Sequence, residues 1–83
     1  MSWRVEWLEP AEKAWKLLPF KDAESVAKTV VKFASSLEGD VELLTEAPEV
    51  TCRLRVGAYT LSLVLDESDA TVWVMWMTRR PGR

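Results

Sequence analysis

Residues 51–66, TCRLRVGAYTLSLVLD, decide the fold, because they contain two alternating segments joined by a short link. Along both segments every second residue is apolar or aromatic: Cys52, Leu54, Val56, Tyr59, Leu61, Leu63 and Leu65. A period of two is typical of strands with one buried face. The link Gly57–Ala58 is typical of a two-residue hairpin turn with glycine first. The stretch therefore predicts a β-hairpin, with Tyr59 in the core.

The chain after this hairpin predicts one more strand. Residues 67–70, ESDA, indicate a turn, and residues 71–78, TVWVMWMT, indicate a strand. Six consecutive apolar residues, Val72 to Met77, put large side chains on both faces of that strand. Packing in the core is the favoured interpretation for Trp73 and Trp76, and stacking on a nucleic-acid base is the alternative. Whether residues 72–77 form core or interface stays open.

The first half of the chain predicts a strand and two helices. Residues 2–9 alternate like a strand, and a helix begins at Pro10 and ends before Pro19. A second amphipathic helix follows, with Asp22 as its N-cap. Residues 40–50 look irregular, because Pro48 argues against a central strand. The order βααβββ predicts one α+β domain over residues 1–83, with two helices packed on one face of a mostly antiparallel four-stranded sheet.

Composition excludes several classes of protein. The 83 residues contain no histidine and one cysteine, which removes the usual general base, most metal sites and any internal disulfide. No motif for a cofactor is present, so we expect none. The longest apolar runs are too short to cross a bilayer and no signal-peptide pattern is visible, so we expect a soluble, cytoplasmic protein without membrane contact. The net charge of −2 is unusual for a strong nucleic-acid binder.

Arginine is the chemistry-bearing residue of the second half of the chain. Arg53 and Arg55 share one strand face, opposite Cys52, and Arg79 and Arg80 close the last strand. Guanidinium groups bind phosphate through two hydrogen bonds, so a converging set would suit RNA. The alternative is that these arginines pair with the acid-rich residues 38–49.

Three segments in this order carry a family resemblance: RVEWLEPAEKAWKLLP (4–19), CRLRVGAYTLSLVLDE (52–67) and VWVMWMTRR (72–80). Together they resemble the RelE/ParE superfamily of toxin–antitoxin toxins, over residues 3–80. The resemblance implies a compact α/β toxin that a cognate antitoxin holds silent. RelE-like members cleave mRNA in the ribosomal A site, whereas ParE-like members inhibit DNA gyrase without nuclease chemistry.

By this resemblance we expect a type II toxin that inhibits translation by ribosome-dependent mRNA cleavage, with antitoxin, ribosome and mRNA as partners. The alternatives are a ParE-like non-enzymatic inhibitor of DNA gyrase and a catalytically degenerate protein-binding module, and a homodimer stays open. The implied catalytic residues are Arg53, Arg55 and Arg80, and the implied RNA-binding residues are Arg79, Lys28 and Lys32. For Lys28 and Lys32 the residue pattern itself favours a solvated helix face, and a helix that contacts RNA would show the same pattern.

Two departures from the family pattern bear on catalysis. Thr60 stands where RelE-like members have an arginine directly after the hairpin tyrosine. The tyrosine that the family places beyond the closing basic pair has no counterpart in these 83 residues. Losing one preorganised donor costs about 10²–10³ in rate, and losing an acid or base a further ~10²–10⁴. The general base therefore stays unassigned.

Overall fold

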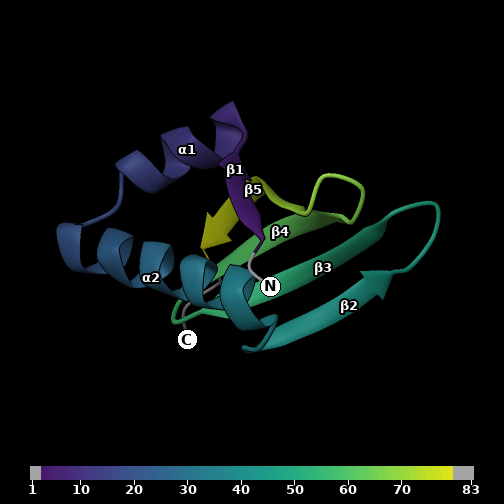
Figure 1. The fold of residues 1–83 in the computed structure, drawn as a ribbon. Coiled ribbons are helices and arrows are strands. Elements are labelled where there is room, and N and C mark those ends of the chain that lie inside the picture. The colour runs from purple at the N-terminus through teal and green to yellow at the C-terminus, as the bar shows by residue number, and fades with distance from the viewer. Residues whose placement is uncertain (1–2, 80–83) are drawn as a thin grey trace.

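The computed structural model describes residues 3–79 as one sheet with two helices on one of its faces (Figure 1). In chain order the elements are β1 (Arg4–Trp7), α1 (Glu9–Lys16), α2 (Phe20–Ser36), β2 (Val41–Thr45), β3 (Val50–Val56), β4 (Tyr59–Asp66) and β5 (Thr71–Arg79). The predicted α+β class and the helices on one face are confirmed. The hairpin is confirmed as well, since Gly57 takes the left-handed φ of 57° between β3 and β4.

The prediction of four strands is wrong, whereas the mostly antiparallel pairing agrees with the prediction. The sheet has five strands in the order β1-β5-β4-β3-β2, and β1 pairs with β5 in parallel while the other pairs are antiparallel. The unexpected strand is β2. Its register shifts between Leu43 and Thr45, which breaks the alternation, and all of its side chains are exposed. Pro48 lies beyond the strand, in the loop before β3, so it does not interrupt the pairing.

The core lies between the helices and the covered face of the sheet. The side of α2 that faces the sheet carries four buried residues at positions i, i+4, i+7 and i+8: Val26, Val30, Phe33 and Ala34. These pack with fully or nearly fully buried side chains of the three central strands: Cys52, Leu54, Val56, Tyr59, Leu61, Leu63, Val72, Val74 and Met77. The predicted stripe of the second helix and the core position of Tyr59 are therefore confirmed.

Helix α1 packs on β5 with Ala11 fully buried, and Trp15 links it to α2 and β1. The Trp15 indole nitrogen donates a hydrogen bond of 2.8 Å to the carbonyl oxygen of Ala23, and its ring lies 5.7 Å from that of Trp7. Asp22 is not an N-cap, because α2 begins at Phe20 with Pro19 before it. The Asp22 carboxylate instead accepts a hydrogen bond of 2.7 Å from the hydroxyl of Tyr59. This bond ties the first turn of α2 to the start of β4.

Strand β5 contains a β-bulge that inverts its two faces. Leu63 pairs with Val74 and Ser62 pairs with Trp76, so Met75 has no partner on β4. Because successive side chains alternate, one extra residue moves all following side chains to the other face. Val72 and Val74 are buried before the bulge, and Met77 is buried after it. Trp76 consequently faces away from the helices.

Candidate functional site

The sheet face that the helices leave uncovered, called the open face below, carries the arginines of β3. Arg53 pairs with Ser62 on β4, and Ser62 pairs with Trp76 on β5, so the three residues form one row across three strands. Adjacent strands are about 4.8 Å apart, which puts the backbones of Arg53 and Trp76 roughly 10 Å from each other. Arg55 lies in the next row, beside Thr60. The open face thus combines an aromatic ring with two cations.

Both arginines form ion pairs with the strand that the sequence did not predict. The Arg53 Nη1 lies 3.2 Å from Oε1 of Glu42, and Nη2 of Arg55 lies 3.6 Å from the same oxygen. The Arg55 Nη1 is also 3.5 Å from Oδ1 of Asp40. The alternative that these arginines pair with residues 38–49 is confirmed. One carboxylate oxygen of Glu42 therefore lies within ion-pair distance of both guanidinium groups.

These ion pairs are open to solvent. The side chains of Arg53, Arg55 and Glu42 are 43%, 37% and 50% exposed to solvent. Ion pairs at this exposure stabilise a fold by only ~0.2–1 kcal/mol each, because water screens the attraction and the side chains lose rotamer freedom. A phosphate that makes bidentate contacts to a guanidinium can therefore displace the carboxylate. Glu42 and Asp40 therefore pair with the two guanidinium groups, but these ion pairs contribute little free energy.

The other candidate residues that the structure describes do not lie beside Arg53 and Arg55 on the open face. Arg79 pairs with Tyr59, whose side chain lies in the core, so Arg79 belongs to the covered face of the sheet. Lys28 and Lys32 are exposed on the side of α2 that points away from the sheet, and Lys28 pairs with Glu24 at 3.9 Å. Arg80 lies outside the described residues.

The reactive side chains near Arg53 face the other way. Cys52 is buried on the covered face, and burial raises the pKa of its thiol. The hydrogen bond to Asp22, followed by burial and the charge of that carboxylate, raises the pKa of Tyr59, while Arg79 lowers it. Thr60 contributes a hydroxyl beside Arg55 on the open face. The arrangement can bind and neutralise phosphate, but neither Cys52 nor Tyr59 can reach it.

Sequence reasoning placed two tryptophans wrongly: Trp73 is half-buried in the lining of an open-face hollow rather than in the core, and Trp76 is exposed. The Trp76 side chain is 61% exposed, whereas packing in the core was the favoured interpretation. Strict alternation from Val72 and Val74 would bury it, and nothing in residues 71–78 marks Met75 as the bulge. The alternative, an aromatic ring available for stacking, fits the observed position.

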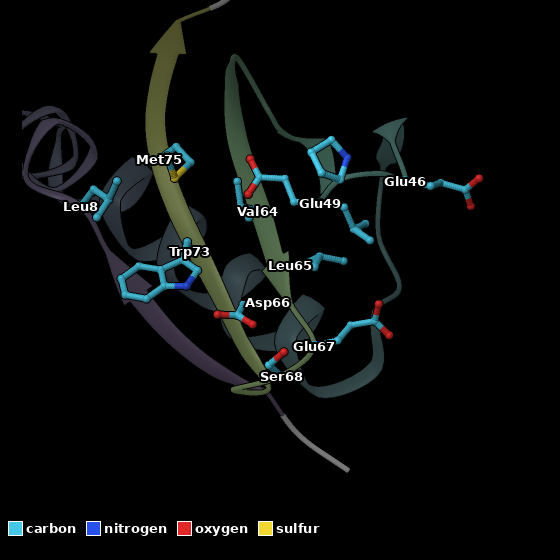
Figure 2. A pocket seen from close by; sticks show the side chains of 12 residues that line it. Leu8, Glu46, Glu49, Val64, Leu65, Asp66, Glu67, Ser68, Trp73 and Met75 are labelled. Atoms are coloured by element: carbon cyan, nitrogen blue, oxygen red, sulfur yellow. The ribbon is translucent and has the colours of Figure 1, made fainter.

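A hollow of about 550 Å³ lies at the far end of the open face (Figure 2). The loop between β2 and β3, the end of β4 with its turn, and the middle of β5 surround it. Its lining combines apolar and acidic side chains: Leu8, Glu46, Pro48, Glu49, Val50, Val64, Leu65, Asp66, Glu67, Ser68, Trp73 and Met75. No basic residue is among them, so this end of the face differs in charge from the Arg53 end.

Two further findings concern metal sites and membrane-spanning helices within residues 3–79. No group of three or more histidine, cysteine or acidic side chains in that range is placed to hold a metal ion. No helix in it is long and apolar enough to span a membrane.

Comparison with solved structures identifies the fold. The RelE chain of the archaeal RelE–RelB complex from Pyrococcus horikoshii matches with a TM-score of 0.86 at 18% identity, covering 100% of both chains. The toxin–antitoxin complex RelBE2 of Mycobacterium tuberculosis matches at 0.81 and 18%, covering 96% of this chain and 93% of that one. The isolated RelE toxin of E. coli matches at 0.76 and 19%, covering 99% and 88%. No family model matches the sequence, and no curated protein matches it significantly. The chain thus has the fold of RelE toxins.

Proposed function

We propose that this chain is the toxin of a type II toxin–antitoxin pair, and that it inhibits translation by cleaving mRNA on the ribosome. The observation that carries the proposal is the row of Arg53, Ser62 and exposed Trp76 on the open face of a RelE-like fold. Two of the similar structures are toxins bound to their antitoxins, which supports a cognate antitoxin as the partner.

In this proposal the RNA lies across the open face. A base stacks on Trp76, which stabilises single-stranded binding by about 1–3 kcal/mol. Arg53 and Arg55 release Glu42 and hold the adjacent phosphate through paired N–H groups. When the 2′-hydroxyl attacks that phosphate, negative charge grows on its non-bridging oxygens, and the two guanidiniums stabilise it. A 2′,3′-cyclic phosphate forms as the 5′-oxygen leaves.

Proton transfer in the same reaction requires groups that the arginines do not supply. The 2′-hydroxyl must lose a proton and the departing 5′-oxygen must gain one. Cys52 and Tyr59 are buried on the covered face, so we assign both transfers to groups of the ribosome. Arg80, from the sequence resemblance, is proposed as a third stabilising charge. Cleavage without ribosomes should then be slower by at least ~10².

The decisive experiment is induction of the chain in cells followed by mapping of mRNA 5′ ends. Cuts at a fixed codon position support the proposal, and the double variant Arg53→Ala/Arg55→Ala should abolish them. Lys13→Ala/Lys16→Ala is the matched control, because it also removes two positive charges, from exposed positions on α1. Cuts that persist in the arginine variant would remove both residues from the site.

A second candidate is a non-catalytic protein-binding role, including inhibition of DNA gyrase. The observation that favours it is the occupation of both arginines by Glu42 and Asp40, beside an exposed tryptophan that is typical of interfaces. Normal translation with a rising DNA-damage response would support gyrase as the target. Absence of toxicity, together with co-purification of the product of an adjacent small gene, would support a binding module.

A further inference from the structure

The hollow at the end of the open face has an apolar floor that no other segment of residues 3–79 covers. Val64, Trp73 and Met75 come from β4 and β5, and Leu8 closes the floor from the link between β1 and α1 (Figure 2). All four are only partly buried. The volume of about 550 Å³ falls within the range of ~300–1,000 Å³ in which protein pockets bind ligands. It is large enough to receive apolar side chains of another molecule.

The rim of the hollow is acidic and uncompensated. Its charged residues are Glu46, Glu49, Asp66 and Glu67. None of these carboxylates forms an ion pair with a residue in the range 3–79. The negative charge at this end of the open face is therefore available to a ligand.

Six carboxylates outside the rim form ion pairs with cations, whereas Asp22, Glu38 and Asp69 form none with residues 3–79. Glu9 and Glu12 pair with Lys13 and Lys16 along α1, and Glu24 pairs with Lys28 on α2. Arg4 is in the same row across the sheet as Asp66, because both are register partners of Thr71. Arg4 forms its ion pair with Glu6, at 3.8 Å, and it does not line the hollow. What distinguishes the rim is that four carboxylates without an ion pair to residues 3–79 lie around one hollow.

We propose that this hollow binds a basic segment of a partner protein, one that carries an apolar residue between lysines or arginines. The apolar side chain would lie on Trp73 and Met75, and the cations would meet the four carboxylates of the rim. A phosphate backbone is disfavoured here, because like charges repel. A bound metal ion is disfavoured as well, since no group of three or more ligating side chains within residues 3–79 is suitably placed. The inference does not depend on the activity proposed for Arg53 and Arg55.

The test uses two labelled hexapeptides with the same apolar centre and opposite charge. Lys-Arg-Leu-Leu-Arg-Lys is the basic probe, and Glu-Asp-Leu-Leu-Asp-Glu is its counterpart. Fluorescence anisotropy at low salt should show the basic probe binding at least about tenfold more tightly, because each opposite charge within ~4–6 Å contributes favourably. Its binding should shift the NMR signals of the Met75 methyl and the Trp73 indole, which lie on the floor.

Two variants with the same change in net charge separate the hollow from the general acidity of the chain. Glu49→Gln/Glu67→Gln is expected to weaken the basic probe by about 5–30-fold, because it removes two rim charges without changing side-chain shape. Glu9→Gln/Glu24→Gln removes two paired carboxylates on the helices and should change the affinity by less than about twofold. Arg53→Ala/Arg55→Ala should leave the affinity for the basic probe undiminished, so failure of the RNA proposal and failure of this inference give different results.

Three results would overturn the inference. One is equal binding of the acidic and basic hexapeptides. Another is equal weakening by the rim variant and the helix variant, which would indicate binding to net charge alone. The last is a labelled oligouridylate that displaces the basic probe and shifts the Met75 methyl signal, which would make this end of the face part of a nucleic-acid surface.

Discussion

Replacing Glu42 by glutamine should increase the affinity of the open face for single-stranded RNA. In the native protein one carboxylate oxygen of Glu42 lies 3.2 Å from Arg53 and 3.6 Å from Arg55. A phosphate must displace that oxygen before it can take both guanidiniums. Glutamine keeps the shape of the side chain and removes its charge, so the competition for the two arginines weakens.

The size of the effect follows from the two ion pairs. At their exposure each stabilises the native state by about 0.2–1 kcal/mol, so Glu42 opposes phosphate binding by roughly 0.4–2 kcal/mol. Since 1.4 kcal/mol is a factor of ten, affinity should rise by about 2–30-fold. The cost in stability is the same 0.4–2 kcal/mol or less, because the glutamine oxygen still accepts a hydrogen bond from Arg53.

Fluorescence anisotropy with a labelled oligouridylate measures the effect at low and high salt. The increase should diminish as salt rises, since exposed charges are screened. Glu9→Gln is the matched control: it makes the same change in net charge, but its partner is Lys13 on α1. If Glu9→Gln raised the affinity as much as Glu42→Gln, the gain would come from net charge, and the reasoning about Arg53 and Arg55 would be refuted. An unchanged affinity in Glu42→Gln would refute it equally.

Three further changes test the face, the core and the link between α2 and β4. Trp76→Ala should weaken oligouridylate binding by ~1–3 kcal/mol while the urea midpoint hardly moves, because the ring is 61% exposed; a large loss of stability would contradict its placement. Leu61→Ala, at a side chain with 0% exposure, should lower the free energy of unfolding by about 2–5 kcal/mol in urea, and a loss below ~1 kcal/mol would place Leu61 outside the core. Tyr59→Phe should lower the melting temperature at pH 7, because it removes the hydrogen bond to Asp22. The folded pKa of Tyr59 is raised, so this stabilisation is full below pH ~10 and is lost as the pH rises through the folded pKa; a difference that stayed constant above pH ~10 would argue against the bond.

Much of the fold could be predicted because local chemistry agreed with the tertiary structure. Gly57 supplies the left-handed turn, alternation separates Leu54 from Arg53, and the apolar spacing of α2 marks its buried side. Strand β2 could not be predicted in the same way. An edge strand with no buried side chain has no hydrophobic pattern, and its pairing to β3 depends on backbone hydrogen bonds that every residue type except proline can make in full.

The candidate site, like the fold, could be predicted from the sequence only in part. Its cations could be placed, because Arg53 and Arg55 belong to a regular strand whose two faces alternate. Its aromatic ring could not be placed, because the bulge at Met75 depends on how β5 fits β4 rather than on any local signal. The hollow depends on the loop between β2 and β3, whose position the sequence does not indicate.

The parallel pairing of β1 with β5 affects when the protein can fold during its synthesis. Arg4 and Thr71, neighbours across that pair, are separated by 67 positions along the chain. Closing so long a loop costs entropy that only the finished sheet recovers, so folding should be slow for a domain of this size. Until β5 leaves the ribosome, β1 has no partner, and α1 lacks the strand on which it packs. A nascent chain would therefore carry Arg53 and Arg55 without Trp76 beside them, and the complete open face would exist only after all of β5 had left the ribosome.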